Sequence, residues 1–389
     1  MANVEFLEPT GSNLSNEAIL GDGYKVLTPG HGANKAWIYS NYPEAMGLNG
    51  KGMAIADPLP ENCNKSYYLN QQTVSGEAEV FFSHNNHSSQ SMYCRVQLYN
   101  PNSTSVSFTV SNIGYVNGWN AGLVWDRYYR MNLDPTDEIA ESIVPYLKSG
   151  TITSEGAVWI TPPFPVGTTT SEMGNPFSGV VHLSVSQDTV VTVYAYRNEG
   201  SVTGESIAFP YDFTHSAENP GELNVAHPGV YTGIGDEFNL SFNHGTIFTS
   251  NLPYKYVTND SSDFPNNEEI IPIRILGENL TADINQSTAS GLNNLANWCV
   301  HNFHYITFKN TLSQQVSISA YLYGAADGAT PVILCNGQLK YVELSTSAGH
   351  LTWKWCTITL APNETFNFNY QHILGTYGNG CQVTEWRLE

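Results

Sequence analysis

The stretch Cys94-Arg-Val-Gln-Leu-Tyr-Asn100, followed by Pro-Asn-Ser-Thr-Ser and then Val106-Ser-Phe-Thr-Val110, decides the fold class of this chain. Apolar and polar residues alternate along both arms, which is typical of strands with one buried and one solvated face. The same phrase recurs in Val181–Tyr196 and in Tyr305–Tyr323. The residues that join the arms are small and polar, as β-hairpins require. The pattern therefore predicts stacked antiparallel sheets.

The length of 389 residues is large for one β-sandwich and sufficient for two. Residues 1–20 read as a polar arm, either an inert tail or a segment docked on a partner that lends a strand to a neighbouring subunit. Short strands predominate in 21–198. The Gly- and Pro-rich stretch 199–230 is interpreted as the connection to a second domain, 231–389. We expect an all-β protein with two antiparallel β-sandwich domains, immunoglobulin-like or jelly-roll-like.

The net charge of −20, from 15 basic and 35 acidic residues, disfavours binding to nucleic acid and to anionic membranes. No apolar run approaches the length of a membrane span, so membrane insertion is not expected. The acidic excess serves solubility or, alternatively, attracts Ca²⁺, for which the loop Asp260–Glu269 is the best candidate. We expect no other cofactor. The first residues lack the pattern of a signal peptide, so a surface location requires a removed leader or a route without one.

Six cysteines and 23 tyrosines bear on assembly. The cysteines are candidates for disulfides within or between subunits, with buried reduced thiols as the equal alternative: Cys63, Cys94, Cys299, Cys335, Cys356 and Cys381. A chain rich in tyrosine and poor in lysine favours burial against other protein, although tyrosine also packs in cores.

One helical segment is expected between Asp134 and Gly150, with Asp134 as N-cap and Pro135 as the first helical residue. The acidic residues of its first turn are explained by favourable charge at a helix N-terminus.

Motifs for catalysis are absent from the sequence: there is no nucleophile elbow, phosphate loop or zinc-protease motif. Cys299, His301 and His304 are the best zinc candidates. On a strand these three do not share one face, so ordinary hydrogen-bonded histidines are the favoured interpretation. An aromatic platform for sugar is a further candidate, with core or interface packing favoured over it: Trp119, Trp125, Tyr128 and Tyr129.

In each half of the chain, a strand that ends in Asn and the Val-containing strand after it are followed by a Thr-Ile pair. These pairs begin the stretches Thr151–Ile160 and Thr357–Phe366. This order resembles the immunoglobulin-like β-sandwich modules of Gram-positive surface and exported proteins, over residues 78–197 and 305–370. The resemblance implies a sandwich fold and a surface or exported location, and it carries no catalytic residues.

The expected function is therefore structural rather than enzymatic. We expect an extracellular or spore-surface subunit that associates with copies of itself as an appendage, coat layer or crystalline deposit, through strand edges and Tyr-rich faces. The alternatives are a carbohydrate-binding or adhesive module with a glycan as partner, a secreted hydrolase that uses a convergent acidic pair, and a β-rich toxin.

Overall fold

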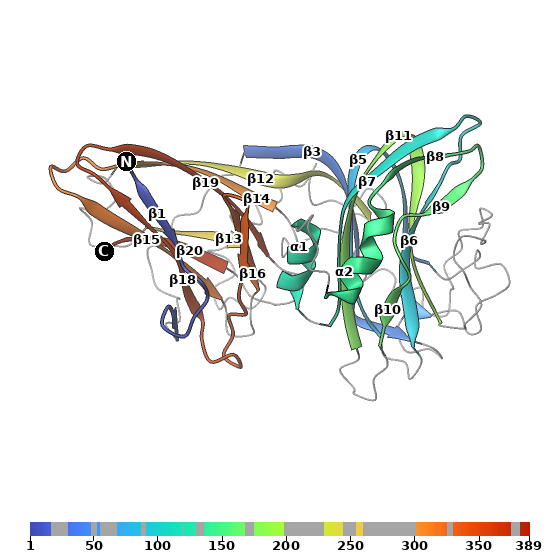
Figure 1. The fold of residues 1–389 in the computed structure, drawn as a ribbon, viewed down its shortest axis with the longest axis horizontal. Helices are drawn as coiled ribbons and strands as arrows, with labels where there is room; N and C mark the ends of the chain where they lie inside the picture. The colour runs from blue at the N-terminus through green and yellow to red at the C-terminus, as the bar shows by residue number, and fades with distance from the viewer. Residues whose placement is uncertain are drawn as a thin grey trace, which may run out of the picture. The chain divides into compact units, whose positions relative to one another are not determined.

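The computed structural model describes residues 1–16, 30–47, 53–54, 68–86, 91–118, 120–129, 136–167, 175–197, 229–243, 254–259, 301–324, 330–374 and 382–389. It is mostly β-structure with antiparallel sheets (Figure 1). The chain divides into two compact units. The central unit comprises 34–232 and 286–293, and the terminal unit comprises 1–33, 233–285 and 294–389.

The central unit contains β3 (Gly30–Gly47, in its greater part), β4 (Met53–Ala54), β5 (Tyr68–Asn86), β6 (Met92–Tyr99), β7 (Val106–Asn117), α1 (Ala121–Tyr129), α2 (Glu138–Ile143), the 3-10 turn η1 (Val144–Tyr146), β8 (Ser149–Ile152), β9 (Ala157–Trp159), β10 (Phe164–Val166) and β11 (Asn175–Arg197). The terminal unit contains β1 (Asn3–Phe6), β2 (Leu14–Ser15), β12 (Gly229–Asn243, in its greater part), β13 (Tyr254–Asn259), β14 (His301–Lys309), β15 (Val316–Gly324), β16 (Pro331–Cys335), β17 (Gln338–Tyr341), β18 (Thr352–Leu360), β19 (Thr365–Leu374) and β20 (Gln382–Leu388).

Two long bent strands organise the central unit. β11 pairs with β5 along most of its length, while its first half also pairs with β7 and its second half with β6. The register shifts between Val185 and Thr189, opposite Gly76, where a φ of 78° suits glycine. The predicted hairpin over 181–196 is therefore wrong. Both of its arms keep β5 as their partner, so the polar residues between them bend one strand instead of reversing it.

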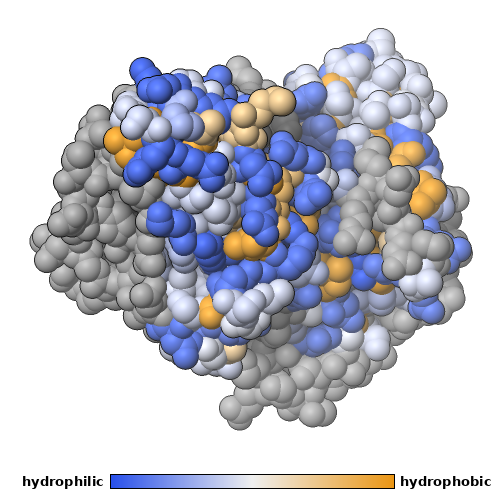
Figure 2. All heavy atoms as spheres, turned by 60° about the vertical axis from the view of Figure 1, so that its left-hand side comes forward, coloured by the Kyte–Doolittle hydropathy of each residue, from blue (hydrophilic) through white to orange (hydrophobic). Residues whose placement is uncertain are grey.

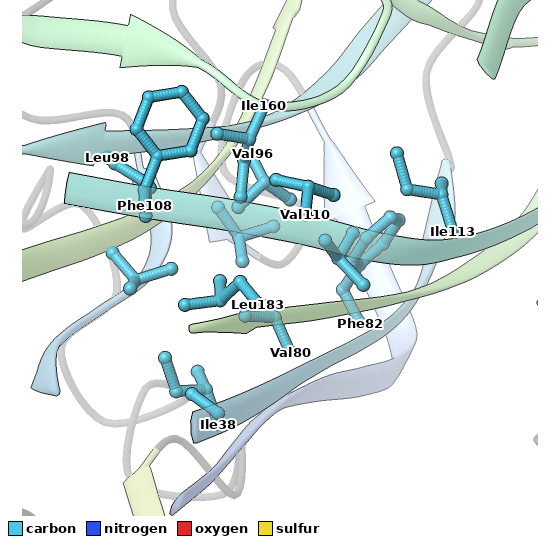
Figure 3. Close-up of a cluster of buried hydrophobic side chains, with 14 of the residues drawn as sticks. Ile38, Val80, Phe82, Val96, Leu98, Phe108, Val110, Ile113, Ile160 and Leu183 are labelled. Atoms are coloured by element: carbon cyan, nitrogen blue, oxygen red, sulfur yellow. The ribbon is translucent and has the colours of Figure 1, made fainter. Parts of the chain in front are cut away.

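The core of the central unit draws side chains from both halves of the bent strands. Val80, Phe82 and Leu183 point into the same cluster as Val96 and Leu98 of β6 (Figure 3). Each is fully buried. Burial of such a side chain contributes about 1.5–3 kcal/mol, so this cluster is the main source of stability of the unit.

The terminal unit contains one sheet in the order β1-β18-β15-β20-β13 and a second series, β12-β14-β19-β16-β17, in which β12 and β14 run parallel. A single core draws on both: Trp353 and Trp355 of β18 and Trp386 of β20 share it with Phe308 of β14 and Phe368 of β19. Their rings contact edge to face or stacked, for example Trp355 against Trp386 at 5.9 Å.

The two-strand stretch that decides the fold class, Cys94–Val110 and its counterpart Tyr305–Tyr323, forms the same structure in both units, but this structure is not a hairpin. β6 pairs with β9, β10 and β11, whereas β7 pairs with β8 and β11, and among the described residues the two arms do not pair with each other. The arms β14 and β15 likewise pair with different strands. The polar residues therefore lead the chain from one group of strands to another.

A fully buried asparagine holds each of these two turns. Asn100 donates from Nδ2 to the carbonyl oxygens of Thr104 (2.8 Å) and Thr153 (2.9 Å), and its Oδ1 accepts from the Asn102 amide. Asn310 repeats the arrangement in the terminal unit, and its donor bonds reach Gln314 (2.7 Å) and Ala361 (2.9 Å). One amide side chain thus satisfies backbone groups that the turn leaves without partners.

This shared arrangement also corrects the alignment of the two halves. Val106 pairs with Ile152, and Val316 pairs with Leu360, so Ile152 corresponds to Leu360 rather than to Ile358. Three residues further on, Glu155 and Asn363 both have positive φ, 55° and 60°. The Thr-Ile pairs that look alike in sequence are therefore out of step by two residues.

Candidate functional site

The edge of the terminal unit carries the arm predicted at the start of the chain. β1 pairs antiparallel with β18, with Val4 opposite Ile358 and Phe6 opposite Cys356. Val4 and Phe6 are half-buried and pack against the core, and the Phe6 ring stacks on Phe368 at 6.4 Å. The alternative of an inert tail is thus wrong for these residues, because alternation in Asn3–Phe6 lets the arm complete a sheet of its own chain. Docking of the arm on a neighbouring subunit stays a prediction.

Residues 3–15, which we call the edge segment, remain attached beyond β1. The Leu7 amide donates to the Trp355 carbonyl at 2.9 Å, and the Lys354 amide donates to the Asn13 carbonyl at 3.0 Å. β2 pairs with Thr352 and Trp353, and Glu8 forms an ion pair with Lys340. The edge segment is therefore bound to β18 by backbone hydrogen bonds that any extended chain of suitable sequence can make.

Apolar exposure on the described surface is scattered. Hydrophobic residues lie among hydrophilic ones on the face shown in Figure 2. Only three large hydrophobic residues of the described parts are exposed: Met1, Val144 and Tyr305. Several described tyrosines pack in the cores, for example Tyr115 and Tyr323, which is the alternative use of tyrosine given above.

The described cysteines are free thiols. Cys94, Cys335 and Cys356 are all buried. Burial raises the pKa of Cys335 to about 12 and raises the pKa of the other two well above the usual value. In the structure these three cysteines are therefore buried free thiols, the second of the two alternatives given above. Cys63, Cys299 and Cys381 lie outside the described residues.

We expect Cys94, Cys335 and Cys356 to resist alkylation in the native protein and to react fully in guanidinium chloride, because a buried thiol with a raised pKa supplies little thiolate. Iodoacetamide labelling at pH 8 with peptide mapping measures each site separately. The denatured sample is the control for intrinsic reactivity. Rapid native labelling of Cys356, which lies behind β1, would mean that β1 leaves β18 readily.

The candidate sugar platform is mostly buried. Trp125 and Tyr128 lie on α1 and are 1% and 5% exposed, and only Tyr129 is half-buried. Their rings contact one another, with Tyr128 and Tyr129 edge to face at 4.9 Å. Core packing, the favoured interpretation, accounts for Trp125 and Tyr128, whereas Trp119 lies outside the described residues.

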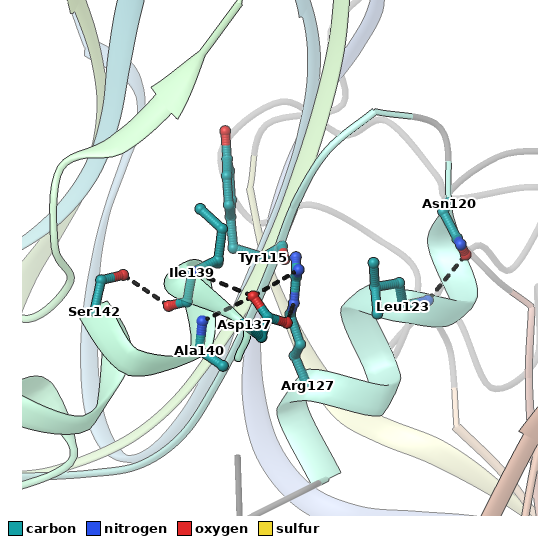
Figure 4. Close-up of polar contacts among 8 residues, drawn as sticks. All are labelled: Tyr115, Asn120, Leu123, Arg127, Asp137, Ile139, Ala140 and Ser142. Atoms are coloured by element: carbon teal, nitrogen blue, oxygen red, sulfur yellow. Dashed lines mark hydrogen bonds and ion pairs between the residues drawn. The ribbon is translucent and has the colours of Figure 1, made fainter. Parts of the chain in front are cut away.

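A charged pair ties the helices to the sheet. Arg127 of α1 donates from Nε and Nη2 to the two carboxylate oxygens of Asp137, at 2.7 and 3.0 Å, and from Nη1 to the Tyr115 carbonyl (Figure 4). Asp137 also caps α2 by accepting the amides of Ile139 and Ala140. The predicted helix therefore exists with acidic residues in its first turn, but Asp137 is its N-cap, and the predicted N-cap Asp134 lies outside the described residues.

The electrostatics of Asp137 follow from these contacts. Burial raises its pKa, and the hydrogen bonds from Arg127 and from the Ala140 amide more than offset this, so the pKa falls below the usual 3.8. The carboxylate is thus charged throughout the neutral range and holds α1, α2 and β7 together.

The histidines behave mainly as packed side chains. His84 Nε2 lies 2.9 Å from the Ser40 hydroxyl, and burial lowers the pKa of His84 to about 3. His304 stacks on Tyr370 at 4.4 Å, and burial, followed by the nearby His372, lowers its pKa well below 6.5. Of the zinc candidates, Cys299 and the His301 side chain lie outside the described residues, as does the acidic loop 260–269. Within the described part, no three ligand side chains gather for a metal.

A second serine–histidine contact was missed by sequence reasoning. Ser111 Oγ of β7 lies 2.6 Å from His182 Nδ1 of β11, and both side chains are half-buried. The two residues are 71 positions apart and carry no local motif, so only the strand pairing reveals the contact.

Comparison with known proteins assigns no family to the chain. No protein-family model and no curated protein matches it. Over 81% of its length it is similar to a mutant salicylate 1,2-dioxygenase from Pseudoaminobacter salicylatoxidans, at 7% identity, 68% coverage of that chain and a TM-score of 0.13. Over 82% it is similar to the CUB1-EGF-CUB2 domain of human MASP-1/3, at 7% identity, 99% coverage and a TM-score of 0.15. Likeness at this level carries no argument about fold or function.

Among the described residues, no helix has both the length and the apolar character needed to span a membrane.

Proposed function

We propose that this protein is a structural subunit that assembles with copies of itself, at an extracellular or spore surface, by exchange of the edge segment. In the assembled form, residues 3–15 of one copy pair with β18 of the next. Each unit acts as a β-sandwich building block, in keeping with the resemblance to bacterial surface modules. The observation that carries the proposal is the pairing of β1 with β18 at the edge of a sheet.

The chemistry of this edge favours exchange. The contacts are backbone hydrogen bonds plus inward apolar side chains, Val4 and Phe6, and another copy supplies identical groups. Removal of the segment uncovers a strand that carries Trp355 and Ile358 beneath it, which is an unstable edge. Scattered exposed hydrophobic residues offer no comparable surface in the described parts. Strand exchange is therefore the route to assembly that this surface supports best.

The test uses the register between Glu5 and Thr357, which lie directly opposite each other across β1 and β18. Opposed residues in an antiparallel pair have Cα atoms about 4.5–5.5 Å apart, within the range of a disulfide. We mix a Glu5→Cys chain with a Thr357→Cys chain, allow assembly, oxidise, and map the bonds by mass spectrometry. We expect a disulfide between residue 5 of one chain and residue 357 of another.

Each single variant alone is the control for adventitious bonds with the native cysteines, and the double variant in one chain is the positive control for geometry. Negative-stain microscopy of the wild-type protein accompanies the assay. Discrete monomers at all concentrations would defeat the proposal of assembly. Ordered particles without the 5–357 bond between chains would keep assembly and reject strand exchange.

A further inference from the structure

The sheet formed by β7, β11 and β5 carries a polar constellation that assembly does not use. It consists of Ser111 on β7, His182 on β11 and Glu79 on β5. From it we infer a nucleophilic serine site, with Ser111 as nucleophile, His182 as general base and Glu79 as the carboxylate that positions the imidazole, acting on uncharged acyl esters.

The backbone directs Ser111 toward His182. The register of β7 against β11 passes from Asn112 opposite His182 to Val110 opposite Leu183, so Ser111 is an extra residue in a β-bulge. A bulge bends its strand locally and re-aims a side chain, and bulges are frequent next to active sites. The result is the 2.6 Å contact between Ser111 Oγ and His182 Nδ1, within the range for a nucleophile and its base.

The carboxylate lies on the next strand, on the same face. Glu79 is directly opposite His182 in the pairing of β5 with β11, which places the two Cβ atoms about 4.5–5.5 Å apart. Glu79 is 1% exposed, and the Nε2 atom of His182 is also buried. When Ser111 donates to Nδ1, the neutral ring carries its proton on Nε2. A buried carboxylate beside this ring stabilises the imidazolium that forms when the serine loses its proton.

The surroundings leave the Ser111 hydroxyl partly accessible to solvent and bury the Glu79 carboxylate. Ser111 and His182 are half-buried, whereas Glu79 is buried and interacts with Tyr128 of α1. Burial and then the charge of Glu79 raise the pKa of Tyr128 well above its usual value, which places the tyrosine hydroxyl next to the carboxylate. The net charge of −20 repels anionic substrates, so the site favours neutral esters.

The reaction follows from these positions. Ser111 Oγ bonds to the acyl carbon as its proton passes to His182 Nδ1. The tetrahedral intermediate then expels the alkoxide, which takes that proton and leaves as the alcohol. Water attacks the acyl-serine by the same proton path, releases the carboxylic acid and restores Ser111. General base catalysis by His182 contributes roughly 10²–10⁴-fold to such a step.

The experiment labels the full-length protein with a fluorophosphonate probe, identifies the modified residue by mass spectrometry, and follows hydrolysis of p-nitrophenyl acetate. We expect the probe to label Ser111. The rate of ester hydrolysis should fall about 100-fold or more with His182→Ala, in line with the contribution of a general base. Ser111→Ala should abolish both labelling and hydrolysis. Ser107→Ala is the matched control, because Ser107 lies exposed on the same strand, and should change nothing.

Circular dichroism establishes that each variant is folded. Ser111→Cys provides a second test that preserves the side-chain shape. In a functioning site its thiol should react with iodoacetamide faster than Cys94, and that advantage should vanish when His182→Ala is added. Two results together would overturn the inference. The folded wild-type protein would be labelled elsewhere or not at all, and the alkylation rate of the Ser111→Cys thiol would not change when His182→Ala is added.

Discussion

Asn310→Ala is expected to destabilise the terminal unit by about 3–5 kcal/mol, because each buried backbone group left without a partner costs about 1–3 kcal/mol. The Asn310 side chain is fully buried. It holds the carbonyls of Gln314 and Ala361 and accepts the Leu312 amide at 3.0 Å. It also donates to the Leu360 carbonyl at 3.4 Å, and alanine removes all four of these bonds. Urea unfolding followed by tryptophan fluorescence measures the loss, and hydrogen exchange assigns it to the unit.

A matched control lies nearby. Asn367 is exposed on β19 and accepts a hydrogen bond from Thr307, so Asn367→Ala should change the stability by no more than about 0.5 kcal/mol. Asn100→Ala should reproduce the large loss in the central unit, where the same bonds recur. A loss below about 1 kcal/mol in Asn310→Ala would mean that the turn recruits water to its carbonyls.

Arg127→Ala is expected to destabilise the central unit by about 2–4 kcal/mol at neutral pH, because it removes one partner of a largely buried ion pair. The Arg127 and Asp137 side chains are 13% and 23% exposed. The substitution leaves the Asp137 carboxylate with the α2 amides alone and deprives the Tyr115 carbonyl of its donor. Chemical denaturation at pH 7 measures the loss.

The pH dependence provides the second arm of this test. The folded pKa of Asp137 is depressed, so its contribution is complete above the unfolded value near 3.8 and is lost as the pH falls through the folded pKa. The difference between wild type and Arg127→Ala should therefore shrink below about pH 3.8. Asp137→Asn, which keeps the cap acceptor and removes the charge, should flatten this dependence. A difference that stays constant to pH 2 would assign the effect of Arg127 to packing alone.

Much of the secondary structure could be predicted from the sequence, because burial of one face imposes alternation on each strand. The strands at 94–110 and 305–323 lie where the pattern indicated, and a helix follows Asp137. What alternation does not encode is the partner of a strand. The turn after Asn100 therefore looked like a hairpin, while pairing with the long strand β11 draws β6 and β7 apart.

The candidate sites depend still more on pairing between distant segments. Ser111, His182 and Glu79 meet only because three strands align in register with a bulge, and no spacing along the chain reports that alignment. The start of the chain read as a polar arm because Ser and Asn dominate the stretch Gly11–Asn16. The role of Val4 and Phe6 became visible only from their packing against the core of the terminal unit.

The position of β1 also sets an order of events during synthesis. Val4 leaves the ribosome about 350 residues before its partner Ile358, and at roughly 5–20 residues per second this interval lasts tens of seconds. For that time the first strand has no β18 of its own chain to pair with. Under the strand exchange proposed above, this interval is when β1 would pair with β18 of another copy, so the translation rate and the density of ribosomes on the messenger would influence how chains connect.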